Sequence, residues 1–156
     1  MPLSEIIMYI IVFLAVYVQI FFLVTFFERR KHLNAIHQEE TPNLSYYPSV
    51  AVIVPCWNEE KTVHGTIESL LALDYPKDKL EILVVDDGST DTTWEEILKY
   101  KDHPQVKIFQ KENGGKHTAV NFGIDHTNAD FISCLDADSF VAHDALKRMI
   151  NLFQKK

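Results

Sequence analysis

Two short stretches of this sequence carry paired carboxylates directly after an apolar run. These stretches are Asp86–Ser89 (Asp-Asp-Gly-Ser) and Asp136–Ser139 (Asp-Ala-Asp-Ser). If they end neighbouring parallel strands, four acidic side chains meet at one edge of a sheet, where their repulsion requires a cation or hydrogen-bond donors. Asp136 and Asp138 predict ligands for one hard divalent ion, Mg²⁺ or Mn²⁺, whose shell is completed by substrate phosphates. The alternative is that each stretch only makes a turn and caps a helix; the repetition favours a site.

A lysine after two glycines is the next candidate. Lys116 follows Asn113-Gly114-Gly115 at the predicted start of a helix, and a helix N-terminus with a lysine suits a phosphate. The signal is weak by itself, because a solvated lysine after a plain connector has the same sequence. The spacing is not that of a P-loop, and no Gly-x-Gly-x-x-Gly follows the first predicted strand.

An aromatic and polar block stands where the first predicted strand ends. Trp57, Asn58 and Glu59 offer a flat ring and polar groups that can meet a nucleobase. The alternative is a helix start, with Asn58 as the capping residue.

The elements that must position these residues alternate between strands and helices. Continuous apolar runs predict parallel strands covered on both faces at residues 50–54, 82–85, 106–109 and 131–135, the first ended by Pro55. Apolar side chains at helical spacing follow each strand: Val63, Ile67, Leu70 and Leu71; Trp94, Ile97 and Leu98; Ala119, Val120, Gly123 and Ile124; Leu146, Met149, Ile150 and Phe153. The pattern predicts an α/β fold, a Rossmann-like parallel sheet with helices on both faces, and ligands outside the carboxyl ends of its strands.

An apolar run, Ile6–Phe27, precedes this domain. As a helix it is about 33 Å long, enough to cross the hydrocarbon core of a bilayer. A signal peptide would have a basic start and a small-residue cleavage site, and a buried core helix would have a polar face. Arg29, Arg30 and Lys31 follow the run, so we expect the N-terminus outside the cell membrane and the remaining chain in the cytosol.

The expected organisation is an external tail at 1–5, a transmembrane helix at 6–27, a juxtamembrane linker at 28–48 and the α/β domain at 49–156. The net charge of −7 argues against nucleic acid as a partner. Cys56 and Cys134 have no paired spacing, so free thiols are expected in a reducing cytosol, and the seven histidines form no ligand cluster in the sequence.

From about Tyr47 to its C-terminus the chain resembles family-2 glycosyltransferases of the GT-A fold. The resemblance rests on four blocks in order: 52–60 (Val-Ile-Val-Pro-Cys-Trp-Asn-Glu-Glu), 84–91 (Val-Val-Asp-Asp-Gly-Ser-Thr-Asp), 112–116 (Glu-Asn-Gly-Gly-Lys) with Ala119, Asn121 and Gly123, and 135–139 (Leu-Asp-Ala-Asp-Ser). Each block is common alone, but the four in this order are specific. A membrane span before such a domain is similar to the cellulose, chitin, hyaluronan and poly-N-acetylglucosamine synthases.

The resemblance implies a metal-dependent inverting transferase, specifically the donor-binding half of a membrane polysaccharide synthase that uses a UDP-sugar. In such enzymes the first block and the Asp86/Asp87 pair hold base and ribose, Lys116 lies near the diphosphate, and the D-x-D motif binds the metal. The implied donor-binding residues are Pro55, Trp57, Asn58, Glu59, Asp86, Asp87, Lys116, Asp136 and Ala137, and the implied metal ligands are Asp136 and Asp138.

The chain departs from the family pattern after the D-x-D motif. Family members place the catalytic base, an Asp or Glu, well beyond this motif, and processive members add a Gln-x-x-Arg-Trp motif and further membrane helices. We therefore expect an inactive N-terminal fragment, with the base and the site for a polysaccharide or lipid-linked acceptor beyond Lys156. The alternatives are a transferase that loads polyprenyl phosphate and a non-catalytic nucleotide-sugar-binding module. A third class, a Mg²⁺-dependent nucleotidyltransferase, lacks support, because this sequence has no glycine-rich basic loop directly after the first predicted strand.

Overall fold

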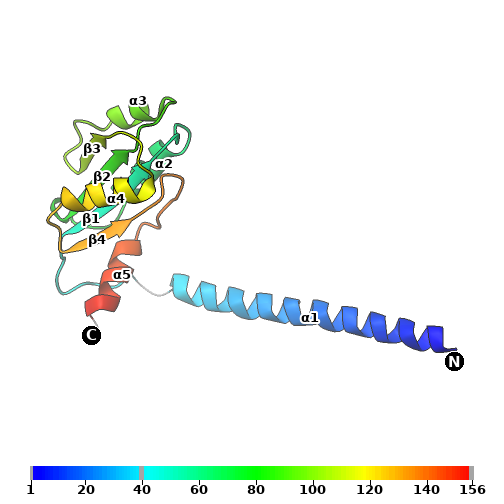
Figure 1. Ribbon diagram of the computed structural model, residues 1–156. Helices are drawn as coiled ribbons and strands as arrows, with labels where there is room; N and C mark the ends of the chain where they lie inside the picture. The colour runs from blue at the N-terminus through cyan, green and yellow to red at the C-terminus, as the bar shows by residue number, and fades with distance from the viewer. Residues whose placement is uncertain (1, 39–40, 155–156) are drawn as a thin grey trace. The chain divides into compact units, whose positions relative to one another are not determined.

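The structure, a computed structural model, describes residues 2–38 and 41–154, with side chains at 2–30 and 41–154 (Figure 1). The chain divides into two units, Met1–Glu40 and Thr41–Lys156. Parts of three predicted segments lie outside the described residues: Met1 of the tail, residues 39–40 of the linker, and the last two residues of the domain. The side chain of Lys31, used to predict orientation, lies outside them as well.

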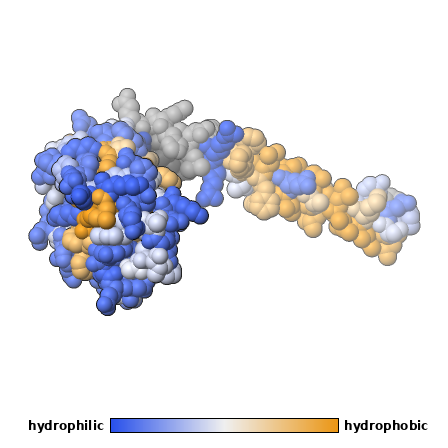
Figure 2. All heavy atoms as spheres, turned by 90° about the horizontal axis from the view of Figure 1, so that it is seen from above, coloured by the Kyte–Doolittle hydropathy of each residue, from blue (hydrophilic) through white to orange (hydrophobic). Residues whose placement is uncertain are grey.

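The first unit is one long helix, α1 (Leu3–Gln38). Its segment Leu3–Arg30 is long and apolar enough to cross a membrane by length and composition, and Figure 2 shows hydrophobic residues along most of it. The predicted span 6–27 lies inside this helix. The helix continues through residues 28–38, so the first part of the segment predicted as a juxtamembrane linker at 28–48 is helical. No proline or glycine interrupts the chain there, and the next helix-breaking residue is Pro42.

The second unit is built on a parallel sheet, as predicted. Its strands are β1 (Val50–Cys56), β2 (Leu80–Asp86), β3 (Val106–Gln110) and β4 (Phe131–Cys134), in the order β3-β2-β1-β4. All three pairings are parallel. β1 lies between β2 and β4, so the two acidic stretches do not follow neighbouring strands. The four carboxylates are therefore divided by the end of β1.

Pro55 lies within β1 and does not end it, contrary to the prediction. Ile53 O accepts a hydrogen bond from Leu135 N at 2.9 Å on the β4 side, and Cys56 O accepts one from Asp87 N at 2.8 Å on the β2 side. Because backbone groups alternate in direction along a strand, Pro55 faces the β4 side, where strand pairing has already ended at Ile53. The missing proline N–H therefore costs no ladder hydrogen bond.

Helices cover both faces of the sheet, which confirms the layered α/β fold. The helices of this unit are α2 (Val63–Leu71), α3 (Thr93–Leu98), α4 (Lys116–Asp125) and α5 (Ala145–Gln154), with a 3₁₀ turn at Lys77–Lys79. On one face, α4 places Ala119 against Ile53 and Leu83. On the other face, side chains of α2, α3 and α5 join those of Val52 and Val84 in a larger core.

The helices bury less of their apolar surface than the periodicity predicted. Leu98, Ile124, Met149 and Phe153 were expected to face inward and are exposed. α4 packs mainly on β1 and β2, and its Phe122 ring contacts Phe109 of β3, while Ile124 points away from the sheet.

Candidate functional site

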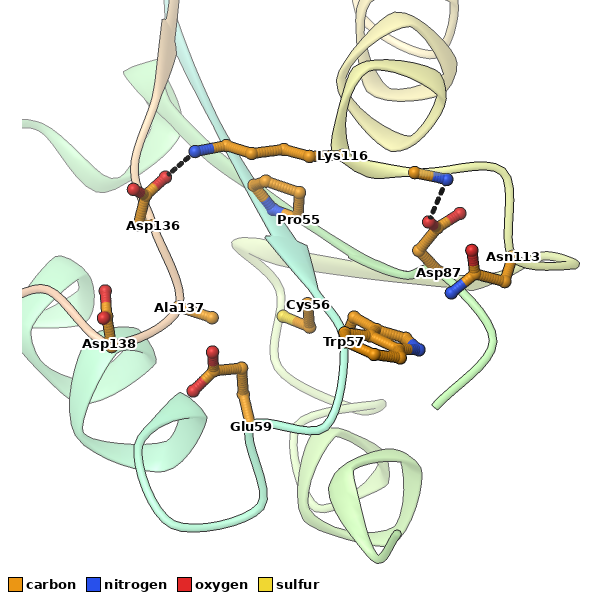
Figure 3. A pocket seen from close by; sticks show the side chains of 11 residues that line it. Pro55, Cys56, Trp57, Glu59, Asp87, Asn113, Lys116, Asp136, Ala137 and Asp138 are labelled. Atoms are coloured by element: carbon orange, nitrogen blue, oxygen red, sulfur yellow. Dashed lines mark hydrogen bonds and ion pairs between the residues drawn. The ribbon is translucent and has the colours of Figure 1, made fainter. Parts of the chain in front are cut away.

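A pocket of about 430 Å³ opens at the carboxyl ends of the strands (Figure 3). Its lining residues are Pro55, Cys56, Trp57, Glu59, Asp87, Asn113, Gly115, Lys116, Asp136, Ala137 and Asp138. From β1 the chain runs through β2 and β3 on one side of the sheet and then returns to add β4 on the other. The pocket thus lies where the strand order reverses, which is where open α/β sheets bind ligands.

The end of β1 forms the middle of the pocket. Cys56 is buried, whereas the Trp57 ring is 56% exposed. Burial, with Asp86 and Glu59 nearby, raises the pKa of the Cys56 thiol far above its ordinary value, so the thiol is protonated at neutral pH. The Glu59 carboxylate accepts a hydrogen bond from Thr62 Oγ1 at 2.5 Å and lies on the side of the pocket where Ala137 and Asp138 lie (Figure 3).

Asn58 connects two loops and does not line the pocket. Its backbone has φ 57°, an uncommon conformation that asparagine tolerates. Asn58 N donates to Ser89 Oγ at 2.9 Å, and Asn58 Oδ1 accepts from Thr90 N at 2.8 Å. The residue at the start of α2 is Thr62, so the alternative of Asn58 as the cap is wrong. These bonds tie the end of β1 to the loop after β2 and so position Trp57.

Asp86 is fully buried beneath the pocket and does not line it. Asp86 Oδ1 accepts hydrogen bonds from Ser89 N at 3.1 Å and Ser89 Oγ at 2.5 Å. Its Oδ2 accepts one from Gln110 Nε2 at 3.0 Å. Both oxygens are therefore occupied by protein donors.

Asp87 lines the pocket and anchors the loop that forms its far wall. Its carboxylate accepts hydrogen bonds from Lys111 Nζ at 2.5 Å, Gly114 N at 3.1 Å and Gly115 N at 2.7 Å. Burial opposes the charge of Asp87, but the hydrogen bonds from Lys111, Gly114 and Gly115 outweigh it and hold the pKa of this carboxyl below its usual range. The loop that begins α4 is thus fastened to the end of β2.

This loop also depends on a glycine. Gly88 has φ 71°, and a Cβ there would lie 2.8 Å from Asn113 N. The close approach and the left-handed backbone both exclude a larger residue. Gly88 therefore lets the loop after β2 and the Asn113–Gly115 loop meet.

Lys116 and the D-x-D residues face one another across the pocket. Lys116, the first residue of α4, forms an ion pair with Asp136, and their side chains are 60% and 54% exposed. Asp136 raises the pKa of the Lys116 ammonium by accepting its hydrogen bond. Ala137, between the two carboxylates, is buried, and its carbonyl accepts a hydrogen bond from Thr66 Oγ1 of α2 at 2.7 Å. This bond fixes the backbone from which Asp136 and Asp138 project (Figure 3).

The donor set suits a metal that arrives with a substrate. Among the described residues there is no group of three or more His, Cys, Asp or Glu side chains that could hold a metal ion. Asp136 and Asp138 are exposed at the pocket and supply hard oxygen ligands. Mg²⁺ and Mn²⁺ accept such an incomplete protein shell, because phosphate oxygens and water complete it.

Several pocket residues were not singled out by the sequence. Cys56, Asn113 and Gly115 line the pocket; the last two belong to the loop that pointed to Lys116. Lys111 contacts Asp87 directly, but a lysine after a strand is too common to predict that contact. Asn58 and Asp86 were predicted in the site and lie behind its walls.

The comparisons with known proteins agree with this geometry. The family model described as "Glycosyl transferase family 2" matches residues 51–156. The chain is 32% identical to poly-β-1,6-N-acetyl-D-glucosamine synthase of Staphylococcus aureus (strain COL) over 148 residues, 92% of this chain and 35% of that protein. The same synthase of Staphylococcus epidermidis is 32% identical over 145 residues, 92% of this chain and 34% of that protein. The chain therefore spans about a third of the length of the curated relatives it matches.

Solved structures with nucleotide sugars share the fold. S. aureus TarS 1-349 in complex with UDP-GlcNAc has a TM-score of 0.63 and 31% identity, covering 69% of this chain and 31% of that chain. The mannosyltransferase PcManGT from Pyrobaculum calidifontis, in complex with GDP-Man and Mn²⁺, has a TM-score of 0.63 and 29% identity, covering 82% of this chain and 38% of that chain.

Proposed function

This chain belongs to glycosyl transferase family 2, and we propose that its pocket binds the UDP-sugar donor of a membrane polysaccharide synthase. The observation that carries the proposal is that one pocket, at the point where the strand order reverses, is lined by Trp57, by Lys116 and by the two D-x-D carboxylates. The named relatives that match most of this chain are polysaccharide synthases, which favours a polymer product over a single sugar on a lipid.

We assign the nucleoside to the side of the pocket between β1 and β2. The exposed Trp57 ring offers a flat surface for the base. Glu59 lies toward Ala137 and Asp138, across β1 from Asp87 (Figure 3), and from there offers a carboxylate to ribose hydroxyls. The Asn113–Gly115 loop, held by Asp87, closes the opposite side. Asn58 and Asp86 act in this proposal by positioning these walls, because their polar atoms are already engaged with protein groups.

The diphosphate belongs between Lys116 and the D-x-D carboxylates. Lys116 supplies a positive charge at the N-terminus of α4, where backbone N–H groups also favour an anion. Asp136 and Asp138 would hold Mg²⁺ or Mn²⁺, which when bound supplies Lewis-acid neutralisation of the leaving diphosphate. Lys116 would stabilise the charge that develops as the anomeric bond breaks. We propose transfer with inversion. An acceptor hydroxyl attacks the anomeric carbon from the face opposite the diphosphate, the nucleoside diphosphate leaves, and a general base takes the hydroxyl proton.

We further propose that α1 anchors the enzyme in the cell membrane with the pocket on the cytosolic side. The apolar length of Leu3–Arg30 supports the span, and Arg29 and Arg30 after it support the orientation. The proposed parts are then a short external tail, the span, a connector and the donor-binding domain that ends the sequence.

A titration of the full chain in detergent micelles tests donor binding. Trp57 fluorescence should change on adding UDP in the presence of Mn²⁺, and Trp57→Phe, which leaves only Trp94, should remove the signal. Asp136→Ala and Asp138→Ala should each abolish the metal-dependent part of the affinity. GDP serves as the competitor, because a structural neighbour binds GDP-Man. UDP binding that is absent, or unaffected by Mn²⁺ and by both variants, would contradict the proposal.

A further inference from the structure

The ion pair between Lys116 and Asp136 occupies the place where the proposed cation must bind. Lys116 Nζ contacts Asp136 Oδ1. Asp138, by contrast, has its nearest donor in the hydroxyl of Ser139, at 3.3 Å. One of the two metal-binding carboxylates is thus already matched with a positive charge, while the other remains available.

The lysine and a divalent cation would compete for Asp136. A doubly charged ion bound to Asp136 would stand within a few ångströms of the Lys116 ammonium, and like charges at that distance repel. Both side chains of the pair are more than half exposed, so the pair itself is weak and Lys116 is free to leave. The lysine begins α4 directly after Gly115, and its long side chain can swing into the space of the pocket.

Two carboxylates alone are also a poor divalent site. The described residues offer no third carboxylate, histidine or cysteine to join Asp136 and Asp138. A bare cation would therefore have to displace Lys116 while gaining only two protein ligands. A diphosphate changes both conditions, since it supplies oxygens to the cation and a new anionic partner to the lysine.

We propose that Lys116 serves as a resident counter-cation that lowers the affinity of the D-x-D carboxylates for metal until a nucleoside diphosphate enters. This inference rests on the proposed function. Nucleotide entry transfers Lys116 from Asp136 to the diphosphate and opens Asp136 to the cation. By thermodynamic linkage, nucleotide and metal each strengthen the binding of the other, and Lys116 accounts for part of that coupling.

Binding of Mn²⁺ alone tests the inference without any enzyme activity. Free Mn²⁺ is measured by electron paramagnetic resonance in titrations of the full chain in detergent, without nucleotide. Lys116→Gln should tighten Mn²⁺ binding about fivefold, the upper range for an exposed pair, and Lys116→Arg, which keeps the charge, should leave it unchanged. In the presence of UDP, the gain in Mn²⁺ affinity should be smaller for Lys116→Gln than for wild type.

Lys107→Gln is the matched control. Lys107 is likewise exposed and paired with a carboxylate, Glu81, but it lies on β3 and does not line the pocket. Its Mn²⁺ affinity should equal that of wild type. Mn²⁺ binding that is unchanged or weaker in Lys116→Gln would overturn the inference even if UDP binds normally. Failure of the wild-type chain to bind UDP would overturn the proposed function instead, and the Mn²⁺ titrations would still decide the role of Lys116.

Discussion

At the end of β2, Asp86 and Asp87 are buried and their oxygens accept hydrogen bonds from side chains and backbone amides. At the end of β4, Asp136 and Asp138 are exposed; the Asp136 carboxylate pairs with Lys116, and the Asp138 carboxylate accepts a hydrogen bond from Ser139. Both pairs follow apolar strands and precede a serine. The carboxylates of the β2 pair are nevertheless held by protein donors, Asp87 at the pocket wall and Asp86 behind it, whereas those of the β4 pair face the pocket with fewer protein partners.

The difference shows that burial can give two carboxylate pairs of similar sequence different roles. A buried carboxylate needs protein donors, because leaving it without partners is costly, and once satisfied it has little capacity left for a ligand. An exposed carboxylate keeps its oxygens hydrated and can exchange water for a cation. We therefore regard the β2 pair as the scaffold of the pocket and the β4 pair as its ligand-binding edge.

Asp87→Ala should have the largest effect on the stability of the protein. The change removes the acceptor of two loop amides and the carboxylate partner of Lys111, whose ammonium keeps Glu112 O and Thr118 Oγ1 as acceptors. We therefore expect a loss of about 3–4 kcal/mol in the free energy of unfolding. Guanidinium unfolding of the full chain in a mild detergent, followed by far-UV circular dichroism, measures it. Asp138→Ala is the matched control. Equal stabilities of the two variants would remove the distinction between scaffold and ligand-binding pairs.

Asp86→Ala should have a smaller effect of the same kind. It removes the acceptor of Ser89 and Gln110 but leaves no charged partner buried. The expected loss is about 1–3 kcal/mol, measured in the same unfolding experiment. UDP affinity should fall only partly, because Asp86 acts on the donor through the loop after β2 and does not touch it. A stable protein that has lost all UDP affinity would instead make Asp86 a direct donor ligand.

The contribution of Asp87 to stability should depend on pH. The pKa of Asp87 is lowered in the folded state, so its stabilisation is present above the unfolded pKa of about 3.9 and is lost as pH falls toward the folded value. The stability difference between wild type and Asp87→Asn should therefore shrink below about pH 4. Other aspartates with lowered pKa values are present in both proteins, so their contributions cancel in the difference between the two unfolding free energies. A difference that stays constant with pH would show that the charge of Asp87 is unimportant.

Asp136→Ala is expected to have the smallest effect on stability. Its side chain is 54% exposed, so the free energy of unfolding should stay within about 0.5 kcal/mol of wild type. Nucleotide binding should meanwhile lose its dependence on Mn²⁺. A large loss of stability would mean that the β4 pair is also part of the scaffold.

Local patterns in the sequence were enough to predict the four strands and the helices between them. Continuous apolar runs mark strands covered on both faces, and the spacing of apolar residues marks helices. Both signals are properties of a few neighbouring residues, so they survive without knowledge of the fold. The resemblance to family-2 glycosyltransferases, later matched over residues 51–156, rested on the same local blocks.

The tertiary structure alone decided which carboxylates line the pocket and which of them are held by protein donors. Strand order placed β1 between the two acidic stretches, and the chain around β2 then buried Asp86 and brought Lys111 and the Gly114–Gly115 amides onto Asp87. Pairing of this kind depends on contacts between residues far apart in the sequence, which no local pattern records. For the same reason, the sequence could not indicate that Asn58 joins two loops or that Lys116 meets Asp136.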